Sequence, residues 1–297
     1  MVSLFPVLKP HSLCSRYADS DVINRSPTLR LPRHLLYPTD HFPLANKDAQ
    51  ILVDKFKHLL RKHLSITTKP IDMTGTLTPL FPSKSVERFQ QASNTLAEWR
   101  TWHDVGKPLI RAYVDKFGAE NILDLGLDPV PERIFKEGKK LTQSDFVEAL
   151  ALKNRFSAVL DEQVFLSNPK TCADSLFMYD AATGGRPSFR REDLNGFEGA
   201  TELILTSPPE GSRTDQLFHY VASMAGLPEV TIPLGQVQYM SPVTGQWEWM
   251  PVAVQIVTKR GCDGVLYELI RKLGDKGIVK AVQAGKEAYI RDSHGAT

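Results

Sequence analysis

The sequence predicts an α/β fold in which a mixed β-sheet is flanked by helices, after a first half that is mainly helical. Two observations lead to this prediction. Apolar residues recur three and four positions apart from residue 46 to about residue 160. Beyond Pro169, short apolar runs alternate with helical patterns, and two of these runs, 230–234 and 251–257, are apolar at nearly every position. Such strands are typical of a sheet that is covered on both faces.

The first part of the chain, residues 1–43, is predicted to be irregular. Six prolines interrupt it, and neither a helical nor a strand period is sustained. The mainly helical part follows at 44–166, and Asn46 is placed to cap its first helix. The apolar residues of that helix, at helical spacing, are Ile51, Leu52, Phe56, Leu59 and Leu60.

Three more helices are predicted in this helical part. Two are expected at 83–105 and at 108–117, the second ending before Gly118. A third, long helix is expected after Thr142, which forms a capping-box pattern with Asp145.

The third part, 167–297, is predicted to carry the mixed sheet. Strands are expected at four places: 175–179, 202–206, 230–234 and 251–257. Helices are expected from Ser212 to a stop at Gly226, from Leu266 to a stop at Gly274, and from about Gly277 to Ile290.

Charge and motifs exclude several classes of protein. The chain has 36 basic and 34 acidic residues among 297, so its formal charge is only +2. A field this weak does not attract nucleic acid or an anionic membrane, and neither is expected as a partner. No apolar stretch approaches the length of a membrane span. No cofactor or metal is expected, because phosphate-loop, dinucleotide-binding and zinc-protease motifs are absent.

The three cysteines predict a reducing environment. Cys14, Cys172 and Cys262 lie far apart and show no C-x-x-C spacing. This pattern argues against a structural zinc site and against a disulfide framework. A cytoplasmic location is therefore predicted.

Two groups of side chains each allow two interpretations. The basic residues on the outer face of the helix after Asn46, between 55 and 63, form either a docking surface or a solvated face, and the solvated face is favoured. Trp99, Trp102 and His103 form either a binding cluster or part of a core, and the core is favoured because aromatic residues at helical spacing are usually buried.

The last quarter of the chain resembles a known family. Residues 226–235 read G-L-P-E-V-T-I-P-L-G, and residues 251–263 read P-V-A-V-Q-I-V-T-K-R-G-C-D. These segments are similar to the C-terminal strand pair of the amidase signature family. Weaker similarity, including L-Y-P-T-D at 36–40, resembles fungal members and extends the likeness to about residues 29–292. The positions that match in order are Ala225, Gly226, Leu227, Pro228, Pro233, Gly235, Pro251, Gln255, Gly261 and Asp263.

The resemblance implies hydrolysis of a carboxamide C–N bond through a Ser acyl-enzyme. In the family a second Ser, held in a cis peptide, and a neutral Lys activate the nucleophile. These residues belong to a Gly/Ser-rich signature in the N-terminal half of the family domain, and no two serines are adjacent in this chain. We therefore assign no catalytic residue and expect the chain to be inactive alone. The S-x-x-K string at 167–170 is expected to be a coincidence, because Pro169 disrupts the helical geometry that this motif requires.

The resemblance also suggests where a substrate pocket would lie. Thr183, Gly184, Gly185 and Arg186 would either shape the mouth of this pocket or form a plain turn, and the turn is favoured. Gln255, an amide in an apolar strand, is expected to satisfy the backbone of a neighbouring loop rather than a substrate.

Three hypotheses about function follow. The chain is an amidase-type hydrolase for a small-molecule amide, in a form without its catalytic half. Alternatively it is a non-catalytic remnant that binds a small molecule or a partner subunit. Finally, a separate polypeptide supplies the complementary half. A homo-oligomer is also expected, because strands that are apolar on both faces and lack part of their sheet tend to associate.

Overall fold

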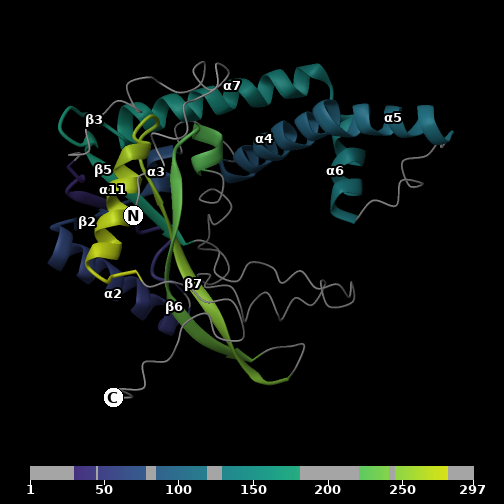
Figure 1. Ribbon diagram of the computed structural model, residues 1–297. Coiled ribbons are helices and arrows are strands. Elements are labelled where there is room, and N and C mark those ends of the chain that lie inside the picture. The colour runs from purple at the N-terminus through teal and green to yellow at the C-terminus, as the bar shows by residue number, and fades with distance from the viewer. Residues whose placement is uncertain are drawn as a thin grey trace, which may run out of the picture. The chain divides into compact units, whose positions relative to one another are not determined.

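The computed structural model describes residues 30–44, 46–77, 85–118, 129–180, 221–240 and 245–279 (Figure 1). They belong to two compact units. The first takes its residues from Met1–Met73, Asp161–Asp215 and Gly226–Thr297, and the second from Thr74–Leu160 and Gln216–Ala225. Within the described ranges, every helix is too short or too polar to cross a membrane.

A five-stranded mixed sheet organises the first unit. Its spatial order is β2 (Thr67–Ile71), β1 (His34–Pro38), β5 (Ser175–Asp180), β7 (Trp247–Val257) and β6 (Glu229–Met240). β1 runs parallel to both of its neighbours, whereas β7 runs antiparallel to β5 and β6. Helix α2 (Lys47–Leu64) connects β1 to β2, as the crossover between parallel neighbours requires. The predicted α/β fold with a mixed sheet flanked by helices is confirmed.

The alternation of side chains gives the sheet two distinct faces. Leu176 and Met178 of β5, and Val252, Val254 and Ile256 of β7, point into the main core. Two helices from opposite ends of the sequence, α2 and α11 (Asp263–Asp275), pack into this core. Their buried contributions are Ala49, Val53, Phe56 and Leu60 from α2, and Val265, Leu266, Leu269 and Leu273 from α11. Odd-numbered residues of the same strands lie on the opposite face.

Helix α2 begins where the sequence predicts. The side chain of Asn46 accepts hydrogen bonds from the backbone amides of Asp48 and Ala49, both at 3.0 Å, which satisfies two amides that the helix leaves unpaired. The buried stripe differs from the predicted one. Ile51 is 62% exposed, whereas Val53, which the prediction omitted, is fully buried.

A β-bulge in β6 lies where α2 approaches the sheet. The register of β6 against β7 shifts between Pro233 and Gly235. A Cβ on Gly235 would lie 3.0 Å from a terminal methyl carbon of Leu52 in α2, a contact that the Leu52 side chain would have to relieve by shifting a few tenths of an ångström. Beyond the bulge, β6 and β7 continue as a long antiparallel ribbon, visible in green in Figure 1.

The second unit is helical. Its helices are α4 (Ser85–Arg100), the π-helix η3 (Thr101–Gly106), α5 (Lys107–Phe117), α6 (Pro129–Lys140) and α7 (Gln143–Val159). The short helices α3 (Met73–Leu77) and η5 (Leu160–Val164) lie where the chain passes between units. The predicted capping box is confirmed, since Thr142 and Asp145 each accept a hydrogen bond from the other's backbone amide.

The structure corrects several sequence predictions. Strand β1 lies in the stretch predicted to be irregular, and β2 lies in the part predicted to be mainly helical. Helix α6 was not predicted. α11 continues through Gly274, and the residue with positive φ beyond its end is Gly277. The predicted strand at 202–206 and nearly all of the last helix, from residue 280, lie outside the described residues.

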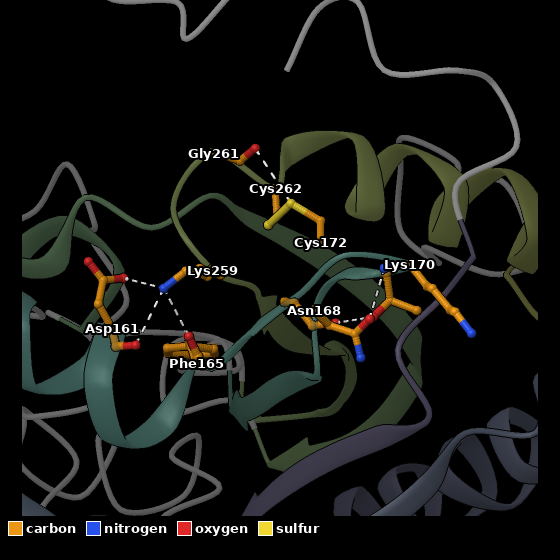
Figure 2. Close-up of a disulfide and its surroundings, with 10 residues drawn as sticks. Asp161, Phe165, Asn168, Lys170, Cys172, Lys259, Gly261 and Cys262 are labelled. Carbon is orange, nitrogen blue, oxygen red and sulfur yellow. Dashed lines mark hydrogen bonds and ion pairs between the residues drawn. A yellow bond between two sulfur atoms is a disulfide. The ribbon is translucent and has the colours of Figure 1, made fainter. Parts of the chain in front are cut away.

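The cysteine prediction is wrong. Cys172 and Cys262, 90 residues apart, form a disulfide with a Cα–Cα distance of 5.7 Å (Figure 2). Cys172 belongs to the hairpin of β3 (Ser167–Asn168) and β4 (Cys172–Ala173), and Cys262 caps α11. Since the argument for a reducing, cytoplasmic environment rested on unpaired cysteines, this pair removes its basis.

Candidate functional site: a polar cluster on the sheet

The predicted pocket residues lie outside the part of the chain that the structure describes. They are Thr183, Gly184, Gly185 and Arg186, within 181–220. The strand that precedes them, β5, is described to its end at Asp180. The candidate site is therefore built from the side chains that β5, β6 and β7 carry.

Four polar side chains gather on the face of the sheet opposite α2 and α11. We name Tyr179, Glu229, Thr231 and Gln255 the polar cluster. Tyr179 pairs in register with Gln255, which pairs in turn with Thr231, so the three lie in one row across β5, β7 and β6. Glu229 lies two residues before Thr231, and alternation puts it on the same face in the next row.

Two hydrogen bonds tie the cluster together. The hydroxyl of Tyr179 donates to a carboxylate oxygen of Glu229, diagonally across the sheet. The hydroxyl of Thr231 donates to the side-chain oxygen of Gln255 at 2.8 Å. The prediction that Gln255 satisfies a loop backbone is therefore wrong, because its oxygen pairs with a side chain on the neighbouring strand.

Burial sets the protonation of the pair. Tyr179 is only 2% exposed. Loss of water raises the pKa of Tyr179, and the neighbouring Glu229 raises it further, so the phenol remains a donor. Loss of water also raises the pKa of Glu229, although the hydrogen bond from Tyr179 opposes this shift. Glu229 as a whole remains exposed, so its carboxylate lies at the boundary between the sheet and solvent.

A second polar contact lies at the end of β5. The backbone amide of Asp180 donates to Nε2 of His41 at 3.2 Å, and both residues are buried. His41 packs edge to face against Phe42, with ring centroids 5.0 Å apart. Asp40, one residue earlier, accepts a hydrogen bond from the amide of Met73 at 3.3 Å. The turn after β1 is thereby fixed to the last residue of β5.

The polar cluster offers hydrogen-bonding groups but contains no Ser or Cys side chain. Gln255 has an amide nitrogen to donate, and Glu229 has a second carboxylate oxygen to accept. Among the described residues, no group of three or more His, Cys, Asp or Glu side chains could hold a metal ion. The arrangement is therefore suited to orienting a polar ligand. The sequence signal was the period-two pattern E-V-T in β6, with Gln255 in an apolar strand, but it does not reveal which strands pair.

Of the two other groups singled out from the sequence, the aromatic group packs within the helical unit, whereas the exposure of the basic group fits both of its interpretations. Trp99 stacks between His103, at a centroid distance of 3.9 Å, and Phe146, at 4.1 Å, so it packs inside the helical unit. Along α2, Lys55, His58 and Arg61 are exposed, whereas Lys57 lies over the ring of Tyr37, with Nζ 3.9 Å from the centroid. The S-x-x-K string forms part of the β3–β4 hairpin rather than a helix.

Comparisons with known proteins place the fold. No family model matches the chain. The urea amidolyase of Kluyveromyces lactis superimposes with a TM-score of 0.51 and 12% identity over 88% of this chain and 13% of that one. A bacterial aryl acylamidase of the amidase signature family superimposes with a TM-score of 0.49 and 12% identity, over 84% of this chain and 46% of that one. A 6-aminohexanoate cyclic dimer hydrolase superimposes with a TM-score of 0.48 and 14% identity, over 86% of this chain and 47% of that one. The chain thus spans less than half the length of each of these proteins.

Proposed function

We propose that this chain is part of an amidase signature domain, with carboxamide C–N hydrolysis as the chemistry of the complete domain. The observation that carries the proposal is how the ten matching positions fold. They form a helix end, a strand to the bulge at Gly235, the antiparallel strand with Gln255, and the turn into α11. Gly261 has φ +77°, which only glycine adopts easily, and Gly235 faces Leu52. The closer likeness to fungal members of the family remains a prediction, whereas the predicted cytoplasmic location has lost the cysteine argument on which it rested.

The chain alone is expected to have no amidase activity. Its sequence has no pair of adjacent serines, and the polar cluster contains no serine that could take the place of the family's nucleophile. The test is incubation of the purified full chain with an aryl amide, with release of the arylamine followed by absorbance. No turnover above buffer is expected. Turnover that co-elutes with the chain through two orthogonal columns would overturn this expectation.

A ligand-binding function is favoured by the polar cluster. A carboxamide has one carbonyl acceptor and N–H donors, which complement the amide nitrogen of Gln255 and the carboxylate of Glu229. Benzamide is therefore expected to raise the melting temperature more than methyl benzoate, which lacks the N–H groups. Glu229→Gln should abolish the difference, whereas Glu162→Gln, at an exposed position in η5, should preserve it. Equal shifts with both ligands would contradict this function.

The partner of the first unit is either a second copy or a polypeptide that supplies the complementary half. Support comes from the ribbon of β6 and β7, where Trp247 is 64% exposed and β6 forms the edge of the described sheet. Light scattering after gel filtration distinguishes the two. A homo-oligomer should appear with the chain alone, whereas a complementary half should appear as a second polypeptide that co-purifies from the native source. A monomer in both measurements would contradict the proposal.

A further inference from the structure

Two different clasps hold the loop that follows β7 (Figure 2). The first is ionic: Nζ of Lys259 donates to Oδ1 of Asp161 at 3.2 Å and to the Phe165 carbonyl at 3.0 Å, and Arg260 pairs with the same carboxylate. The second is the Cys172–Cys262 disulfide. The ionic clasp ties the loop to η5 and its end, whereas the disulfide ties it to the β3–β4 hairpin.

The two sulfur atoms of the disulfide differ in their surroundings. Cys172 is partly exposed and lies at the hairpin with φ +65°, a conformation that residues other than glycine rarely adopt. Cys262 is only 3% exposed and is the N-cap of the thirteen-residue helix α11. An incoming thiol therefore reaches Cys172 more easily. A thiolate at Cys262 would face the positive end of the helix dipole, which stabilises it as a leaving group.

We infer that this disulfide is a thiol-reducible clasp that opens in a fixed order. The thiolate of a small thiol or protein dithiol attacks Sγ of Cys172 and forms a mixed disulfide. The Cys172–Cys262 bond breaks, and its electron pair leaves on Sγ of Cys262, which then takes a proton from water. A second thiol attacks the mixed disulfide on the sulfur of the reductant and releases Cys172 as a thiol. In total, two thiols are oxidised to one disulfide, and the protein disulfide is reduced to two thiols.

Opening the clasp should loosen the hairpin more than the loop after β7. β3 and β4 pair at only two positions. Besides the disulfide, the hairpin is held by short hydrogen bonds within it and by the burial of Ala173 in the main core. The amide of Ala173 donates to the Thr171 carbonyl at 2.8 Å, and that of Asp174 to the Leu166 carbonyl at 3.0 Å. The loop after β7 keeps its hydrogen bonds from Lys259 to Asp161 and Phe165. Local opening free energy depends on such remaining contacts, so the two segments should respond differently to reduction.

The order of opening can be tested by trapping. The oxidised full chain is treated briefly with 2-mercaptoethanol, quenched with iodoacetamide and mapped by mass spectrometry. The expected product carries mercaptoethanol on Cys172 and carbamidomethyl on Cys262. Mercaptoethanol mainly on Cys262 would overturn the order, and a map of the untreated chain without the Cys172–Cys262 cross-link would overturn the clasp itself. Cys14, in the same digest, reports on the reactivity of a cysteine outside the clasp.

The structural consequence can be tested by hydrogen exchange. Reduction should speed exchange at Ala173 and Asp174 by about tenfold or more, while exchange at Val265, whose amide donates to the Cys262 carbonyl, changes less. Cys172→Ser should exchange fast at the hairpin with or without reductant, and Cys14→Ser should behave like the unchanged chain. Equal exchange at Ala173 in the oxidised and reduced chain would overturn the proposal, as would loss of protection throughout the first unit in Cys172→Ser.

Discussion

Gly138→Ala tests how closely α6 packs against its neighbours in the helical unit. A Cβ at Gly138 would lie 2.2 Å from the Glu98 carbonyl oxygen in α4 and 2.7 Å from Cβ of Trp102 in η3. Neither atom is the free end of a flexible side chain, because one belongs to the backbone and the other is attached directly to it. The added methyl group can therefore be accommodated only if α6 moves away from α4.

Two effects of opposite sign determine the result. In a helix that is free on that side, replacing glycine by alanine stabilises by about 0.5–1 kcal/mol. A contact of 2.2 Å is about 1 Å shorter than an ordinary van der Waals contact. Overpacking of this kind typically costs about 1–3 kcal/mol. Gly138→Ala is therefore expected to lower the free energy of unfolding of the helical unit by about 1–2 kcal/mol.

Gly274→Ala is the matched control. Gly274 also lies near the end of a helix, α11, but nothing stands within 4 Å of the position of its Cβ. This change should stabilise α11 by about 0.4–1 kcal/mol. The assay is urea unfolding combined with hydrogen exchange, read in α4 and α6 for one variant and in α11 for the other. If Gly138→Ala slows exchange as Gly274→Ala does, the close approach of α6 to α4 is refuted.

Three further changes test other contacts. Replacing Cys172 and Cys262 together by serine opens a 90-residue loop and should cost up to about 4.6 kcal/mol in the chain-entropy account, seen as a lower urea midpoint that reductant no longer alters. Tyr179→Phe removes the hydrogen bond that opposes the burial effect, so the pKa of Glu229 should rise further in an NMR titration. The pKa of Glu229 is raised on folding. The contribution of Glu229 to the free energy of unfolding is therefore fully present below its pKa in the unfolded chain, and it is lost as pH rises through its pKa in the folded chain. Asn46→Ala should lower the free energy of unfolding, measured in urea, by about 1 kcal/mol. Asn46→Asp should retain most of the stabilisation that the N-cap provides.

Elements that carry their own local signal were predicted well. α7 begins at a capping box, α5 ends at Gly118, and the two apolar strands are found as β6 and β7. The helices were found from their caps and apolar spacing, and these depend on residues only a few positions apart. The pattern of α2 nevertheless misled at Ile51, because spacing alone does not show which residues at the edge of a stripe are covered.

Features that depend on distant residues could not be predicted. β1 is five residues long and lies among prolines, and only its pairing with β2 and β5 makes it a strand. The disulfide joins cysteines 90 residues apart, a pairing with no local pattern. Likewise, the partner of Gln255 depends on the register of β6 against β7. The polar cluster therefore became visible only once the order of the strands was known.

The place of β1 determines where this chain can be shortened. β1 is not at an edge, since it lies between β2 and β5 and is parallel to both. A fragment that starts at the cap of α2, Asn46, would keep every helix described above, yet it would split the sheet into an isolated β2 and a three-stranded remainder. The five residues His34–Pro38 thus connect β2, and the α2 crossover that leads to it, with the strands that carry the polar cluster.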